Sequence, residues 1–360
     1  MRSWLCIALC LSCAARRPLS TAPSEPLQVA APDGGRRIVE AVALGRAISR
    51  GTPVPIAQLQ AELQETRTGE AAAWALGRSP EGVRPLQDCI ERSCPSAVAA
   101  ARALSGPGAV KAPAPPLATL TAALAGPGPL ASEAALSLGI LARSGKEKEV
   151  ATASREALIA ALMRPEPAVR AGAAYALGRI PRGSEKEAAA GSRLATALES
   201  ALRDEDPFVR LLAARAWGKQ GLAASGLAGA LRDPDWRVRV EGARGLAMLT
   251  DAGPLIAAAM PAAVAQLGRG DAREARFAHP LVALIEAAET QGELALQAIP
   301  EPARLAAPTP AATATVRCAA ARARDRIRKL LADTPACAAG MEPEWRSRLR
   351  AGALAAELGP

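Results

Sequence analysis

The sequence predicts an all-α fold, an α-solenoid (superhelix) of stacked antiparallel helix pairs. The first observation is a motif that occurs three times between residues 155 and 250. In each copy, a valine is followed four positions later by a small residue and eight positions later by a large apolar one, which places all three on one face of a helix. A second apolar helix accompanies each copy. The valines are Val169, Val209 and Val238, so the pairs recur after 40 and 29 residues, as is typical of a stacked solenoid.

The amino-acid composition is the second observation. Ala, Leu, Arg and Glu are abundant, whereas aromatic residues make up 2% of the 360 residues. Ala and Leu are the best helix formers, which favours an all-α chain. Closely stacked helices are served by small residues at their contacts, whereas a compact globule of this length would fill its core with larger side chains. The formal net charge of +9 is explained either by arginines spread over solvated helix surfaces or by an acidic partner.

Apolar spacing places helices in order along the N-terminal part of the chain. They are expected at residues 36–49, 59–66, 69–78, 85–90, 95–104, 117–124 and 130–139. Two of them, 69–78 and 95–104, carry copies of the repeated motif, and 130–139 restores it. The stretch 105–116 is rich in Pro and Gly and is expected to interrupt the helices.

The three central motifs and their partner helices continue the stack. The partner helices are expected at residues 158–163, 194–202 and 222–231. Pro167 and Pro207 mark helix starts, where a missing amide donor costs nothing. Asp206 and Asp235 lie in the cap region of such starts, where a carboxylate can accept orphan amides. Beyond Pro254 the pattern weakens, so the best repeats lie at 130–250 and the pattern is degenerate after 270. The later helices are expected at residues 255–267, 280–288, 315–332 and 343–358, the last as a cap near Trp345.

The N-terminus has the features of a signal peptide. Residues 1–12 combine one early positive charge with an apolar run about half as long as a bilayer span requires. The sequence Leu11-Ser12-Cys13 resembles the end of a bacterial lipobox, although Cys10 departs from its usual residue. The resemblance implies lipidation of Cys13, a flexible tether over residues 13–35 and an outer-membrane lipoprotein facing the periplasm. The alternative is a cleaved signal and a soluble periplasmic protein. The solenoid is then expected over residues 36–360.

The cysteines agree with export. Cys13 would carry the lipid, and four cysteines of the expected solenoid form two local pairs. In an oxidising compartment, Cys89 with Cys94 and Cys318 with Cys337 are possible disulfides. The alternative is four buried or idle thiols. No metal site is expected, because the chain has one histidine and neither cysteine spacing is that of a zinc knuckle.

The repeated motif also resembles a known family. Units with Pro-x-Val-Arg followed by Ala-Leu-Gly look like HEAT repeats, especially the bacterial type also found in phycobilin lyases. The match is clearest over residues 165–249 and covers about two thirds of the chain after the leader. The resemblance implies that the Val and Leu positions build the core between helix layers. It also implies structural ladder contacts between repeats, made by Arg170, by Asp206 with Arg210 and by Asp235 with Arg239.

The function predicted from these features is that of a non-enzymatic protein-binding scaffold or assembly factor in the bacterial cell envelope. The lipoprotein-like leader with such repeats looks like exported HEAT proteins, and a solenoid offers a long concave surface, expected here from the second helices. No catalytic constellation, cofactor motif or small-molecule site is evident. The only histidine, His279, has no nucleophile motif near it. The membrane is expected to be contacted only through the lipid anchor.

Two alternatives remain open. The first is a HEAT-type enzyme or enzyme subunit, either similar to a bilin lyase or the companion of a prolyl isomerase, although aromatic residues are few. The second is nucleic-acid binding through the basic helix 315–332. The alternating arginines of that helix spread around its circumference instead of following one face, which makes nucleic acid a less favoured partner than protein.

Overall fold

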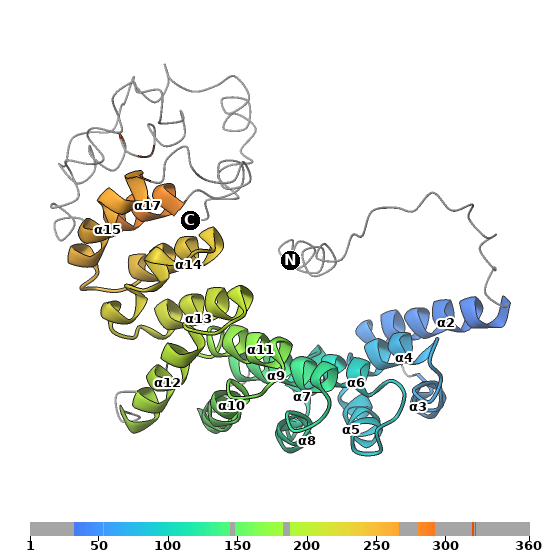
Figure 1. Ribbon diagram of the computed structural model, residues 1–360. Helices are drawn as coiled ribbons and strands as arrows, with labels where there is room; N and C mark the ends of the chain where they lie inside the picture. Colours follow the sequence, from blue (N-terminus) through green and yellow to red (C-terminus); the bar gives the residue numbers. More distant parts are fainter. Residues whose placement is uncertain are drawn as a thin grey trace, which may run out of the picture.

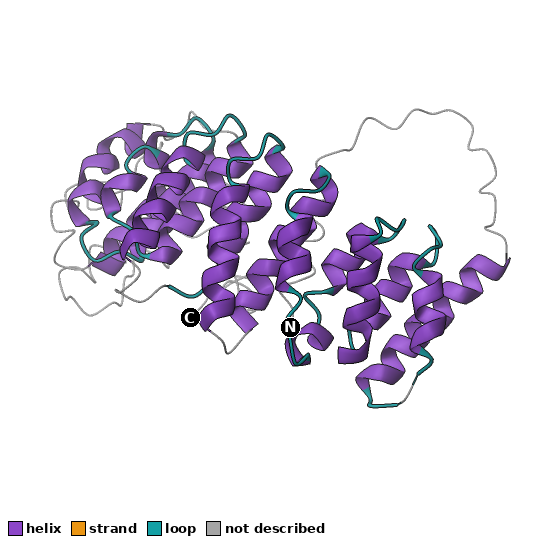
Figure 2. Ribbon diagram, turned by 90° about the horizontal axis from the view of Figure 1, so that it is seen from below, coloured by secondary structure: helices purple, strands orange, loops and turns teal. Residues whose placement is uncertain are grey.

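The computed structural model describes residues 32–52, 54–144, 148–182, 188–265, 280–291, 319 and 321. Within these residues the chain is helical and contains no strand (Figure 2). The helices stack side by side into a curved, two-layered array (Figure 1). The predicted fold class, an all-α solenoid of stacked helix pairs, is therefore confirmed.

The inner layer lines the concave side of the curve (Figure 1). Its helices follow each other as direct neighbours along the stack. They are α2 (Pro32–Ser49), α4 (Gly69–Leu76), α6 (Ala97–Ala103), α9 (Gly128–Ser144), α11 (Pro167–Leu177), α13 (Pro207–Gln220), α14 (Trp236–Ala247) and α17 (Pro280–Gln291). These helices carry the repeated motif. The expectation that the second helices build the concave surface is therefore wrong.

The outer layer covers the convex side (Figure 1). It consists of α3 (Ile56–Glu62), α5 (Val83–Glu91), α8 (Leu117–Ala123), α10 (Lys148–Ala161), α12 (Ala188–Ala201) and α15 (Gly253–Ala265). Each lies against the inner helices next to it in the chain. The core sits between the two layers and runs the length of the stack.

Three sequence-predicted segments differ in detail. The first helix begins at Pro32, so it includes the last residues of the predicted 13–35 tether. The 105–116 stretch is not a plain interruption, because it contains the short helix α7 (Pro107–Lys111), which starts with proline at its first turn. The helix predicted at 343–358 lies outside the described residues, and of the one predicted at 315–332 the structure describes Ala319 and Ala321, both helical.

The predicted partner helix 222–231 is replaced by two 3₁₀ turns, η4 (Ala224–Leu227) and η5 (Ala230–Arg232). Its neighbour α13 carries Trp217 where the other motifs carry leucine, and the indole fills the space that an outer helix would use. A Cβ at Gly226 would lie 2.0 Å from the Trp217 ring. The indole Nε1 donates to the Ala223 carbonyl, 2.8 Å away. In the repeat that carries Trp217, the segment after the inner helix thus forms 3₁₀ turns, with Gly226 against the indole ring.

Six inner helices, α4, α6, α9, α11, α13 and α14, bury a large side chain at the same position of the motif, which for α6 is the residue directly after the helix. These are Leu76, Leu104, Leu138, Leu177, Trp217 and Leu246, all buried. Burial of a leucine side chain contributes about 2 kcal/mol to stability. The same helix position therefore anchors every repeat to the layer beneath it.

Neighbouring inner helices approach each other most closely at small residues. A Cβ added at Gly139 would lie 2.6 Å from the Ala176 Cβ, and one at Gly218 would lie 2.4 Å from the Gly245 Cα. In both pairs, a glycine directly after the core residue faces a small residue directly before the next core residue. The Ala-Leu-Gly part of the motif is thus the helix-to-helix contact of the stack.

Glutamine side chains join consecutive inner helices at their C-terminal ends. Gln220 of α13 donates to the carbonyls of Leu177 and Ile180, at 2.7 and 2.8 Å. Gln291 of α17 donates in the same way to Leu246 and Leu249, at 3.3 and 2.6 Å. These bonds satisfy carbonyls that a helix end leaves without partners. The repeated contact identifies α17 as one more inner helix, so the stack continues past residue 270.

Candidate binding surface on the concave face

Six of the inner helices, α4, α6, α9, α11, α13 and α14, carry a large side chain at one corresponding position. An inner helix contacts a neighbour on each side and the outer layer beneath, so its fourth side faces the hollow of the curve (Figure 1). The residue two positions before each core residue falls on that side. These residues are Trp74, Arg102, Leu136, Tyr175, Arg215 and Arg244, and we call them the variable row. They are large and differ between repeats, whereas the residues directly beside each core position are small.

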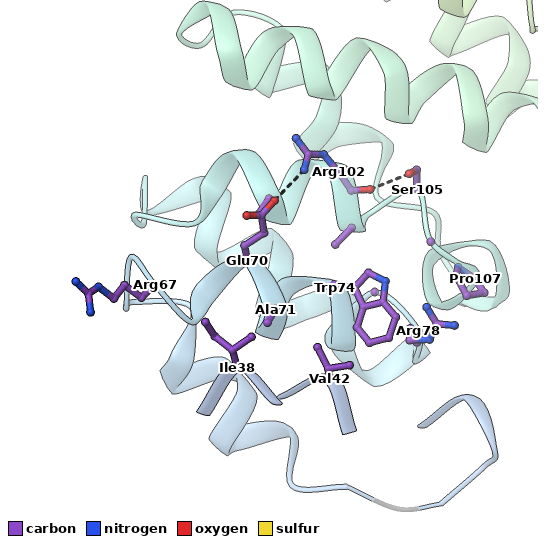
Figure 3. Close-up of a pocket in the computed structure, with 14 residues that line it drawn as sticks. Ile38, Val42, Arg67, Glu70, Ala71, Trp74, Arg78, Arg102, Ser105 and Pro107 are labelled. Carbon is purple, nitrogen blue, oxygen red and sulfur yellow. Dashed lines mark hydrogen bonds and ion pairs between the residues drawn. The ribbon is translucent and has the colours of Figure 1, made fainter. Parts of the chain in front are cut away.

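The N-terminal end of the variable row is a groove formed by α2, α4 and α6. It has a volume of about 490 Å³ and is lined by Ile38 and Val42 of α2 and by Ala71 and Trp74 of α4 (Figure 3). Trp74 is 40% exposed. The Arg78 guanidinium lies over its ring, 4.3 Å from the centroid, in a cation–π contact. An exposed, oriented indole beside aliphatic side chains is a common anchor for a protein partner.

Arg102 ties three inner helices together at the edge of this groove. Its NH1 lies 3.0 Å from Glu70 of α4 and its NH2 lies 2.7 Å from Glu133 of α9. The hydrogen bond to Glu133 is the main reason why the Arg102 pKa is raised. Ion pairs as exposed as these contribute about 0.5 kcal/mol to stability. Their main effect is to hold these three charged side chains in place beside Trp74.

The C-terminal end of the row is basic. Arg215 of α13 and Arg244 of α14 both pair with Glu241, at 3.6 and 3.1 Å. On α11, the Arg179 guanidinium lies 5.4 Å from the centre of the Tyr175 ring and donates to its hydroxyl. The two ends of the concave face therefore offer different chemistry, an aromatic groove and a cationic surface.

The predicted repeat ladder exists, but with other carboxylates than expected. Arg170 binds Asp204 of the next repeat through two parallel bonds, at 2.6 and 2.9 Å. Arg210 binds Asp233 of the following repeat in the same way, at 2.7 and 3.0 Å. Arg210 therefore pairs with Asp233 and not with the predicted Asp206, and Arg170 pairs with Asp204. Asp204 and Asp233 lie two residues before Asp206 and Asp235, the carboxylates named from the sequence.

Each ladder arginine also bonds to the loop before its own helix. NH1 of Arg170 donates to the carbonyls of Arg164 and Pro165, and NH1 of Arg210 donates to those of Asp204 and Glu205. Arg239 repeats this contact on Asp233 and Pro234. The guanidiniums of Arg170 and Arg210 therefore each hold the loop of their own repeat and also bind the aspartate of the next repeat.

Asp206 and Asp235 cap helices and do not take part in the ladder. Asp206 accepts the Phe208 amide at 2.7 Å, and Asp235 accepts the Arg237 amide at 2.8 Å. Both are the N-cap residues of their helices, as their place before α13 and α14 suggests. Their carboxylates point at these amides, and this leaves Asp204 and Asp233 to meet the arginines.

The environment of Asp204 lowers its pKa. Burial raises the pKa of this carboxyl, but hydrogen bonds from Arg170 and from the Asp206 amide outweigh burial and hold the pKa below the ordinary value of 3.8. The Arg170 pKa is raised, mainly by the same hydrogen bond to Asp204. The pair is therefore charged throughout the physiological range.

Acid is expected to weaken the stack through Asp204. Because its folded-state pKa is the lower one, the unfolded chain binds more protons. The stabilisation is therefore complete above the unfolded-state value and is lost as the pH falls through the folded-state pKa. Thermal unfolding midpoints measured from pH 6 to pH 3 should fall less in Asp204→Asn than in the unmodified protein. Parallel curves for the two proteins would contradict the assignment.

The remaining predicted site residues are placed in part. A disulfide joins Cys89 and Cys94 across the turn after α5, and their Cα atoms lie 5.0 Å apart, a separation that disulfides require. Cys13, Cys318, Cys337 and His279 lie outside the described residues, as do the basic side chains of the predicted helix 315–332.

The described part of the chain contains neither a candidate metal site nor a candidate membrane-spanning helix. No group of three or more His, Cys, Asp or Glu residues is arranged there to hold a metal ion. None of the helices described has the length and apolar character needed to cross a membrane.

Comparison with known proteins gives matches among solved structures only. No protein-family model matches the chain, and no curated protein matches it. An engineered protein is 20% identical over 83% of this chain and 87% of its own, with a TM-score of 0.47. The CpcE–CpcF complex of phycocyanin lyase from Nostoc sp. is 31% identical over 49% and 65%, with a TM-score of 0.38. An archaeal HEAT-like repeats protein from Thermococcus onnurineus is 15% identical over 77% and 98%, with a TM-score of 0.41. These similarities concern the repeat fold alone.

Proposed function

We propose that the protein is a non-enzymatic scaffold that binds a segment of a protein partner along its concave face. The observation that carries the proposal is the variable row, with the exposed Trp74 at its N-terminal end. Trp74 packs in part against Gly45 of α2, and Tyr175 packs in part against the core. Four of the six side chains in the row are nevertheless exposed, namely Trp74, Arg102, Arg215 and Arg244. They stand on a rigid stack whose neighbouring positions are fixed by small residues, and this arrangement suits recognition.

The chemistry of the row supports a polypeptide partner. Tryptophan, tyrosine and arginine are the residues that most often carry the energy of protein interfaces, and the row contains all three. Arg78 over Trp74 and Arg179 over Tyr175 hold both rings in defined orientations, which lowers the entropy lost on binding.

Trp74→Ala is expected to weaken partner binding by roughly 30-fold, as for a tryptophan at an interface hot spot. A photo-crosslinking phenylalanine analogue is placed at Tyr175, on the concave face, in the cells that naturally make the protein. The adduct formed there should disappear when Trp74→Ala is introduced and should persist in Trp74→Phe. Trp74 is 40% exposed and its ring also lies against Gly45 of α2, so the unfolding midpoint should fall in Trp74→Ala and should be largely kept in Trp74→Phe, which retains an aromatic ring at this contact.

The matched control places the same analogue at Met163, an exposed apolar residue after outer helix α10. No Trp74-dependent adduct should form there. Adducts that are equal at the two positions, or that persist in Trp74→Ala, would count against the concave face as the binding surface.

We further propose that the scaffold acts in the cell envelope, anchored by a lipid on Cys13 and separated from the membrane by the residues that follow. The apolar residues 1–12 and the cysteine after them support this proposal. One acyl chain binds membranes only reversibly, so stable anchoring needs more than one chain.

Cys13→Ser is expected to move the protein from the membrane fraction to the soluble fraction. The measurement is detergent phase partitioning of cell fractions, with the intact mass of the purified protein as a second readout. Cys94→Ser, which leaves the N-terminus unchanged, is the control and should remain with the membrane. An unmodified protein that is already soluble would instead favour the cleaved, soluble periplasmic form.

A further inference from the structure

The charge of the concave face changes along the stack. Near α4, α6 and α9, three arginines (Arg67, Arg78 and Arg102) lie beside two carboxylates, Glu70 and Glu133. On α13 and α14, Arg215 and Arg244 share one carboxylate, Glu241, and Lys219 of α13 is exposed beside them. The C-terminal end therefore has three cations for one carboxylate, whereas the N-terminal groove has three for two.

The shared carboxylate does not neutralise this end. Glu241 carries one negative charge and its side chain is 12% exposed, whereas the side chains of Arg215 and Arg244 are 47% and 54% exposed. A guanidinium has five donors, and Glu241 engages one nitrogen of each arginine. Both arginines are exposed, and so is Lys219, one turn after Arg215 on α13. Glu241 thus orients two cations and leaves most of their donors available.

Helix ends explain part of this pattern. Lys219 and Arg244 lie in the last turns of their helices, where a cation is favoured by the helix dipole. Arg215 lies more than one turn before the end of α13, so the dipole does not account for it. Its position in the variable row, opposite Arg244 across Glu241, is better explained by an anionic ligand.

The N-terminal part of the variable row favours an acidic polypeptide over a nucleic acid as the anionic ligand. A nucleic acid that follows basic side chains needs phosphate contacts along its path. Here the row changes from Arg244 and Arg215 to Tyr175, Leu136 and Trp74, which suits a chain with both acidic and apolar side chains. The groove at Trp74, with a volume of about 490 Å³, has room for one or two such side chains.

We infer that the partner segment is an acidic polypeptide with an apolar or aromatic anchor. The anchor occupies the groove of α2, α4 and α6, and Asp or Glu side chains bind Arg215, Lys219 and Arg244. This inference rests on the proposed function. Four helix steps separate α4 from α13, or roughly 35 Å at a helix spacing of about 9 Å. An extended chain covers that distance with about 10 residues.

The test is selection of binders from a displayed library of random 20-residue peptides, with the full chain as bait. Selected peptides should combine an aromatic or large apolar residue with an Asp or Glu cluster about 10 residues away. Arg215→Gln/Arg244→Gln should weaken their binding at least 10-fold. The matched control, Arg193→Gln/Arg203→Gln, removes two exposed arginines from α12 and the loop after it on the convex side and should leave binding unchanged.

The outcomes separate this inference from the proposed function. The inference would be wrong if the selected peptides require Trp74 but are not enriched in Asp or Glu, and bind Arg215→Gln/Arg244→Gln as tightly as the unmodified protein. The proposed function, a scaffold that binds on its concave face, would still stand. Peptides that bind independently of Trp74 would remove the proposed function itself. Tighter binding of a 20-base-pair DNA duplex, abolished by Arg215→Gln/Arg244→Gln, would replace the acidic polypeptide by nucleic acid. Unfolding midpoints of both double variants verify that each is folded.

Discussion

Asp204→Ala is expected to lower the free energy of unfolding by about 3 kcal/mol, the low end of the cost of breaking a buried ion pair from one side. The side chains of Arg170 and Asp204 are 11% and 9% exposed, and two parallel bonds join them. Removing the carboxylate leaves the guanidinium buried without its partner and deprives the Asp206 amide of its acceptor. The measurement is equilibrium unfolding in urea.

Two further variants test whether the loss in Asp204→Ala comes from the Arg170–Asp204 pair. Asp206→Ala removes only the N-cap bond to Phe208 and should cost about 1 kcal/mol. The double variant Arg170→Met/Asp204→Leu should be more stable than Asp204→Ala, because neither charge then remains buried alone. The single variants Arg170→Met and Asp204→Leu complete the cycle. If the double variant loses as much stability as these two single variants added together, Arg170 and Asp204 are not a coupled pair.

Gly139→Leu is expected to destabilise the protein by about 3 kcal/mol, as overpacking of a tight core contact does. Leucine is a better helix former than glycine, so helix propensity alone would raise stability by about 0.8 kcal/mol. The steric effect dominates, because even a Cβ at this position would lie 2.7 Å from the Ala176 Cα, which is backbone and cannot rotate away. The contact joins α9 to α11 in the middle of the stack.

The form of the unfolding curve is a second readout for Gly139→Leu. Stability of a solenoid is approximately a sum of repeat and nearest-neighbour terms, so a weakened central contact should separate one transition into two. Gly229→Leu is the matched control, because nothing lies within 4 Å of a Cβ there and its backbone is in the right-handed helical region. A similar loss in both variants would mean that the α9–α11 contact is not the cause.

The helical layers could be predicted because the repeated motif shows which face of each helix is buried. Valine, alanine and leucine at intervals of four identify a face that must be buried, whatever lies beneath it. The segment after α13 could not be predicted in this way. Its apolar pattern is helical, but the size of Trp217 decides the backbone, and a residue 9 positions earlier in the chain is not visible to local periodicity.

The ladder shows a second limit. Asp204 and Asp206 are two residues apart in one loop, and either carboxylate can cap a helix or meet an arginine. Only the path of the loop decides that Asp206 turns to the Phe208 amide and Asp204 to Arg170. Composition and spacing identify the residue types of such a contact, but the assignment of partners needs three dimensions.

The candidate binding surface was missed because it lies outside the apolar stripe. Trp74 and Tyr175 each occur two positions before a core leucine, a regularity that is present in the sequence. Apolar spacing identifies the residues that pack in the core, and the remaining positions are then taken to face solvent. Comparing the same helix position across repeats would have shown large, changing side chains between invariantly small neighbours.

The Arg–Asp pairs all run in one direction along the chain. Each arginine belongs to one repeat and its carboxylate to the repeat made after it. In a chain synthesised from its N-terminus, each of these arginines is therefore made before the aspartate that it binds. Each rung can close only after the loop of the following repeat has been made, so the order of synthesis sets the earliest point at which a rung can form.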